Sequence, residues 1–213
     1  MNEPGPTLDP GGSKTGAALL KAARALFSEH GFDGTSVRAI TARAGANLGA
    51  ITYHFGSKQA LYEAVIAAGV LPSHERLAAA AAEDSPPLQR VEGVVRAFFD
   101  YLHENPELPG ILLQLLSSSR PIPPVALQTV RANLGLLASL IAEGQSQGSI
   151  RAGDPRLMAL SIGAQPIWLA LARRALQEGA EIDQDDPRTR ARVVDSVVDF
   201  VRAGLAENSE STE

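Results

Sequence analysis

Apolar residues recur at helical spacing along almost the whole chain, and few segments show the alternation typical of a strand. Leu19, Ala23, Leu26 and Phe27, for example, fall on one face of a single helix. Hydrophobic residues make up 45% of the 213 residues, which is enough to bury a sizeable core. The pattern predicts an all-α protein with about nine helices.

Residues 14–60 predict three helices separated by short turns. A long first helix is followed by Thr35 and Ser36, either of which can cap a short second helix. Gly45 ends that second helix, and Asn47 is able to cap a third. Two short helices joined by a tight glycine-containing turn and supported by a longer helix form the helix-turn-helix plan. We therefore predict a three-helix DNA-binding domain here.

The charge distribution agrees with a DNA-binding segment although the net charge of the chain is −5. Between Lys14 and Glu63, six basic side chains stand against three acidic ones. The remainder of the chain is therefore the acidic part. A basic small domain joined to an acidic large one fits a module that faces phosphates, although chance segregation of solvated charges is the alternative.

The rest of the chain predicts further amphipathic helices with proline and glycine between them. One of them begins at Pro155 with Asp154 as its cap and runs to about Glu178, with a kink or a break at Pro166. Residues 1–13 are rich in proline and glycine and predict a flexible arm. Residues 61–208 predict a larger helical domain for ligand binding and dimerisation, and residues 209–213 a disordered tail. The sequence has no signal peptide pattern and no uninterrupted apolar run of about 18 residues, so we predict a cytoplasmic protein.

The residues that carry most enzyme chemistry are missing or scattered. Cysteine is absent, and the four histidines have no metal-ligand spacing. The sequence also lacks a phosphate-binding glycine loop and a nucleophile elbow. We therefore predict a protein that is not an enzyme and needs no metal or cofactor. The alternatives are an enzyme that uses scattered carboxylates and a helical scaffold or ligand-binding protein without a DNA function.

Three stretches, Thr35–Ile40, Ala44–Asn47 and Ile51–Leu61, together resemble the TetR family of bacterial transcriptional regulators. The resemblance extends from Leu26 to Tyr62, and the Tyr-His-Phe sequence at the end of the third predicted helix, Tyr53–Phe55, is similar to one subgroup of the family. It implies a homodimeric repressor that binds a near-palindromic double-stranded operator and is released by a small-molecule effector.

The geometry of a helix-turn-helix predicts which residues meet DNA, because the start of the recognition helix faces base edges and flanking groups clamp phosphates. The residues in the base-reading position are Asn47, Leu48, Gly49, Ala50 and Thr52. Phosphate contacts are expected from Thr35, Ser36, Arg38, Tyr53, His54 and Lys58. The alternatives are that Asn47 only caps its helix, that Tyr53 only packs, and that Arg38 and Lys58 are ordinary solvated charges.

Candidates for the effector pocket are the aromatic and apolar residues of the central helices, with a few polar neighbours. They are Phe98, Phe99, Tyr101, Leu102, Leu112, Gln114, Leu116, Gln165, Trp168 and Leu171. This mixture favours a small, mostly apolar ligand, although at least half of the set is expected to be core.

The resemblance also implies that the last two helices form the dimer interface as a four-helix bundle. Small residues that permit close approach and a C-terminal apolar stripe agree with this. The interface candidates are Ala164, Ala172, Val194, Val197, Val198, Val201 and Leu205. The alternative is that the valine stripe packs within its own chain.

Overall fold

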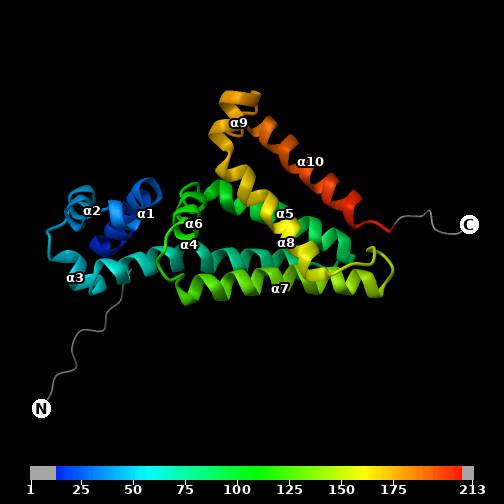
Figure 1. Ribbon diagram of the computed structural model, residues 1–213, viewed down its shortest axis with the longest axis horizontal. Coiled ribbons are helices and arrows are strands. Elements are labelled where there is room, and N and C mark those ends of the chain that lie inside the picture. Colours follow the sequence, from blue (N-terminus) through cyan, green and yellow to red (C-terminus); the bar gives the residue numbers. More distant parts are fainter. Residues whose placement is uncertain (1–12, 208–213) are drawn as a thin grey trace, which may run out of the picture. The chain divides into compact units, whose positions relative to one another are not determined.

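The computed structural model describes residues 13–207 as ten helices without a strand (Figure 1). The helices are α1 (Lys14–Gly34), α2 (Val37–Ala44), α3 (Ala50–Phe55), α4 (Lys58–Ala81), α5 (Pro87–Glu104), α6 (Leu108–Ser117), α7 (Pro124–Ser146), α8 (Pro155–Leu171), α9 (Arg173–Ala180) and α10 (Pro187–Leu205). The all-α prediction is confirmed. The predicted tail and, apart from Ser13, the predicted arm lie outside the described residues.

The chain divides into two compact units. Unit 1 comprises the described residues up to Val70 together with Glu107–Ala126, and unit 2 comprises Leu71–Pro106 and the described residues from Leu127 onward. Helices α4 and α7 each begin in unit 1 and continue in unit 2. Neither unit coincides with a predicted functional domain, so the boundary predicted at residue 60 between the DNA-binding and ligand-binding domains stays a prediction.

Local capping sets most helix ends in the N-terminal part of unit 1. The Ser36 hydroxyl accepts a hydrogen bond from the Ala39 amide and begins α2. Gly45 ends α2 in the left-handed conformation, with φ of 64°. The predicted cap by Asn47 is wrong, because α3 begins only at Ala50 and has no side-chain cap. Asn47 instead lies in the connection before α3.

The core of unit 1 joins the first three helices to the start of α4. The largest fully buried side chains of unit 1 are Leu19, Phe27, Ile40, Ile51, Leu61, Ile66 and, from α6, Ile111. Helix α6 also packs against α1. Gly31 of α1 and Gln114 of α6 are so close that a Cβ atom added at Gly31 would lie only 2.8 Å from the Gln114 Oε1 atom. An ion pair between Arg24 and Glu107, at 3.4 Å, connects the same two parts of the chain.

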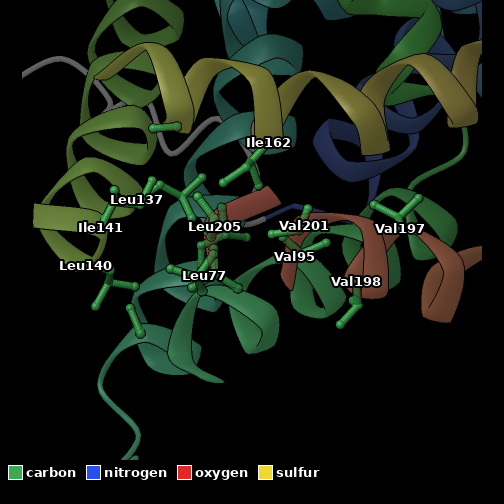
Figure 2. Close-up of a cluster of buried hydrophobic side chains, with 14 of the residues drawn as sticks. Leu77, Val95, Leu137, Leu140, Ile141, Ile162, Val197, Val198, Val201 and Leu205 are labelled. Carbon is green, nitrogen blue, oxygen red and sulfur yellow. The ribbon is translucent and has the colours of Figure 1, made fainter. Parts of the chain in front are cut away.

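Unit 2 is held together by one large apolar cluster contributed by α4, α5, α7, α8 and α10 (Figure 2). Helices α8 and α10 both contact α5. The Arg202 guanidinium holds the Glu92 carboxylate of α5 with two hydrogen bonds of 2.7 and 2.8 Å. The two-pronged contact fixes how α10 lies along α5.

Helix α7 is long and apolar enough to cross a membrane by length and composition. It nevertheless places Leu137, Leu140 and Ile141 in the core of unit 2, and its Asn133 amide oxygen lies 2.8 Å from His74 Nδ1. One face of α7 therefore packs in the core of unit 2, while 28% of its most apolar stretch is buried overall.

The region predicted as one helix from Pro155 to about Glu178, with a kink or a break at Pro166, is two helices. Helix α8 begins as expected, with Asp154 as its cap, but it continues through Pro166 and ends at Leu171. The short helix α9 follows. This division accounts for the tenth helix.

Candidate DNA-binding interface

The connection before α3 and one face of α3 form an exposed surface on unit 1. Asn47, Leu48, Gly49, Thr52 and Tyr53 are all exposed. Leu48 is 54% exposed and Tyr53 68%, so both side chains are open to a binding partner. This surface, formed by these five residues, is called the reading surface below.

The opposite face of α3 holds the helix in place. Ile51 and Phe55 are buried in the core of unit 1, as expected. Ala50 is also buried, so its predicted place among the base-reading residues is a correction: its methyl group packs inward.

Thr35 is the second correction among the predicted DNA contacts. It is only 2% exposed, and its hydroxyl donates to the carbonyl oxygens of Leu26, at 3.1 Å, and Gly31, at 2.7 Å. Both carbonyls belong to the last turns of α1. The hydroxyl therefore ties the end of α1 to the start of α2 and does not face a phosphate.

We expect Thr35→Val to lower the free energy of unfolding by about 1–3 kcal/mol, because buried carbonyls lose their donor while the side-chain shape is kept. Urea denaturation measures the change. Thr35→Ser keeps the hydroxyl and is the matched control. If the valine variant were as stable as the serine variant, the two hydrogen bonds would not stabilise the fold.

Helix α2 presents one cation for a phosphate contact. Arg38 is exposed in the first turn of α2, two residues after the Ser36 cap, and its guanidinium has no ion-pair partner among residues 13–207. Arg43 at the far end of the helix lies 3.7 Å from the Glu29 carboxylate. Arg38 is therefore the basic side chain of α2 that stays available to an anion.

His54 lies between the reading surface and the start of α1. Its Nδ1 is 3.5 Å from the Ser13 hydroxyl, and its ring meets the Tyr53 ring edge to face at 4.9 Å. The Ser13 hydroxyl also caps α1 by accepting from the Gly16 amide. The pairing of Ser13 with His54 was not predicted, because the two residues are far apart in sequence.

Lys58 is held by its own unit. Its Nζ donates to the Phe32 carbonyl oxygen at 2.6 Å and lies 4.1 Å from the centre of the Phe32 ring. Burial lowers the pKa of Lys58 below its ordinary value, and the Asp33 carboxylate opposes this shift. The ammonium has three donors, so a phosphate contact in addition to the Phe32 bond stays a prediction.

The predicted pocket residues are divided between the two units. Leu112, Gln114 and Leu116 belong to unit 1, whereas the remaining candidates belong to unit 2. Phe99, Tyr101 and Leu102 are buried in α5, and Phe98, Gln165 and Leu171 are half-buried. Leu116 and Trp168 are 71% and 66% exposed, which corrects their predicted place inside a pocket.

The predicted dimer stripe is also corrected. Val194, Val197, Val198, Val201 and Leu205 are buried in the apolar cluster of their own unit, as the alternative interpretation held (Figure 2). Ala164 is exposed and Ala172 is half-buried. The periodic pattern identified a buried face correctly, but the face is covered by the same chain.

Other faces of the last helices carry exposed apolar residues. On α8 these are Leu157, Leu160, Ala164 and Trp168, which follow one another at helical spacing. On α10 the exposed residues include Phe200 and Ala203. We call these two stripes the outer faces of α8 and α10.

Comparison with known proteins identifies relatives across most of the chain. Residues 19–65 match the family described as "Bacterial regulatory proteins, tetR family". The transcriptional repressor NicS of Pseudomonas putida is 27% identical over 197 residues, covering 88% of this chain and 90% of NicS. The transcriptional regulator UidR of Escherichia coli is 27% identical over 139 residues, covering 64% of this chain and 69% of UidR.

Solved structures share the fold. The ketosteroid transcriptional regulator KstR2 of Mycobacterium tuberculosis superposes with a TM-score of 0.72 at 22% identity, covering 92% of this chain and 97% of KstR2. AibR, solved with isovaleryl coenzyme A and operator DNA, gives a TM-score of 0.71 at 18% identity, covering 88% of this chain and 97% of AibR.

Proposed function

The chain belongs to the TetR family of bacterial regulatory proteins, and we propose that it is a cytoplasmic homodimeric repressor released from its operator by a small ligand. Its relatives over most of the chain are helix-turn-helix transcriptional regulators, and the chain is one as well. The observation that carries the proposed mode of binding is the reading surface. Leu48 and Tyr53 are exposed there while the other face of α3 is buried.

The chemistry of the reading surface fits a major groove. Asn47 and Thr52 carry the hydrogen-bonding groups that base edges require, and Leu48 offers an apolar surface to thymine methyl groups. Gly49 has no side chain, so the backbone before α3 can approach the bases closely. Arg38 and the hydroxyl of Tyr53, itself part of the reading surface, supply the proposed phosphate contacts.

We expect Arg38→Gln to weaken operator binding by about tenfold and to lower the slope of log affinity against log salt by about two, one phosphate contact in each half-site. Fluorescence anisotropy with an operator duplex at several salt concentrations measures both quantities. Lys21→Gln removes the same charge from an exposed position on α1 and is the matched control. An unchanged salt slope in the Arg38 variant would contradict the assignment.

The outer faces of α8 and α10 support the proposed homodimer. Trp168 and Phe200 are 66% and 68% exposed, and neither is covered by its own chain. Two such helices from each protomer would form a four-helix bundle that removes these side chains from water. A symmetric dimer would present two reading surfaces to the two halves of a near-palindrome.

Ligand release requires that an effector favour one arrangement of the two reading surfaces over another. Successive major grooves on one face of DNA are about 34–36 Å apart, so a dimer with another separation binds poorly. Helix α4 is continuous from unit 1 into unit 2 and can carry such a change. The half-buried and buried apolar residues of α5 favour a mostly apolar effector bound in unit 2.

A further inference from the structure

The loop between α6 and α7 contacts the end of α1 and the start of α4 through one arginine. An Arg120 amino nitrogen donates to Gln59 Oε1 at 2.6 Å, and the other lies 3.2 Å from Asp33 Oδ1. The guanidinium carbon lies 3.9 Å from the centre of the Phe32 ring. An exposed ion pair alone contributes little, but a planar guanidinium held on three sides has a fixed position.

These contacts meet at Phe32, which packs between α1 and α4 of unit 1. Its ring meets Tyr62 of α4 at 5.0 Å and Phe27 of α1 at 5.9 Å between ring centres. Its carbonyl oxygen accepts the hydrogen bond from Lys58. Arg120 therefore contacts both the end of α1, which leads into α2, and the first turn of α4.

The Arg120 contacts lie beside open space. A hollow of about 100 Å³ is lined in part by His30, Gly34, Ser118 and Arg120 itself. The Arg120 side chain is half-buried and its Asp33 partner is mostly exposed. The guanidinium can therefore leave the Phe32 ring without opening the apolar core of unit 1.

We propose that Arg120 is a positioning residue that couples the α6–α7 loop to the DNA-binding helices. Helix α7 begins at Pro124, soon after Arg120, and continues into unit 2. A displacement of α7 would pull Arg120 away from Phe32 and Asp33 and release the turn that leads into α2. The effect on operator binding rests on the proposed function, whereas the effect on the turn does not.

The test compares full-length Arg120→Gln and Arg120→Lys with Arg131→Gln, a matched control on an exposed arginine of α7. Amide hydrogen exchange over residues 31–36 reports the turn without DNA, and binding to an operator duplex reports the function. Thermal unfolding shows that each variant is folded.

We expect exchange over residues 31–36 to be about tenfold faster in Arg120→Gln and less accelerated in Arg120→Lys, which keeps the charge but loses the planar fork. Operator affinity should fall at least about fivefold in Arg120→Gln. The control should match the wild type in both measurements.

Unchanged exchange in Arg120→Gln would overturn the proposal whatever the DNA result. Faster exchange with unchanged operator affinity would overturn the coupling. Wild-type protein that binds no DNA sequence would refute the proposed function. In that case, faster exchange in Arg120→Gln would still support the role of Arg120 in holding the turn.

Discussion

Replacing Leu48 by glutamate is expected to weaken operator binding by at least about 100-fold while leaving the fold intact. Leu48 is exposed at the centre of the reading surface, so the change creates no cavity and buries no charge. In the complex, each protomer would place a carboxylate in a groove lined by phosphates. Anisotropy titration of an operator duplex measures the affinity, and circular dichroism measures the fold.

The matched control is Leu113→Glu, which makes the same change at an exposed leucine of α6 in the same unit. It should bind the operator as the wild type does. Equal loss in both variants would mean that added negative charge anywhere on unit 1 prevents binding, and Leu48 would lose its assigned place in the groove.

Trp168→Glu is expected to convert the dimer to a monomer of 22.4 kDa and to weaken operator binding by more than about 100-fold. Trp168 is the largest exposed apolar side chain on the outer face of α8. In a symmetric bundle, the substitution would bury a charge in each protomer without a partner. Sedimentation equilibrium measures the mass, and the affinity falls because each half-site is then bound independently.

Leu127→Glu is the control for the dimer prediction, because it adds the same charge at an exposed apolar position of α7. This variant should remain dimeric. A dimeric Trp168→Glu protein, or a monomeric Leu127→Glu protein, would move the interface away from the outer faces of α8 and α10.

Helix positions were predictable from the sequence because capping is local. Ser36, Gly45 and Asp154 each act within a few residues, and each defines a helix end as expected. The prediction that Asn47 caps a helix was wrong, because a side chain suited to a cap does not determine where the first helical turn begins. Ala50, which was predicted to read bases, lies on the buried face of α3.

Burial patterns identified which faces are covered but not what covers them. The stripe from Val194 to Leu205 has the period of an interface helix, yet these side chains pack in the core of their own unit. The period is the same in both cases, because any helix with one covered face shows it. Trp168 was predicted to line the pocket but is exposed, and the reason is related: aromatic residues occur in both pockets and interfaces.

Several contacts that organise unit 1 join residues far apart in the chain, so sequence spacing could not reveal them. Arg120 and Asp33 are 87 positions apart, and Ser13 and His54 are 41 apart. The composition of the α6–α7 loop carries no signal for such a pairing. Only the packing of α6 against α1 brings Arg120 to Phe32.

The most direct test of sequence-specific operator binding is selection from sheared genomic DNA of the source organism. The purified protein is incubated with the fragments, bound DNA is sequenced, and affinity for the most enriched site is measured at several salt concentrations. We predict enrichment of one short near-palindrome, bound by a dimer with an affinity that falls steeply as salt rises. Fragments recovered without a common sequence, or no recovery at all, would contradict the account.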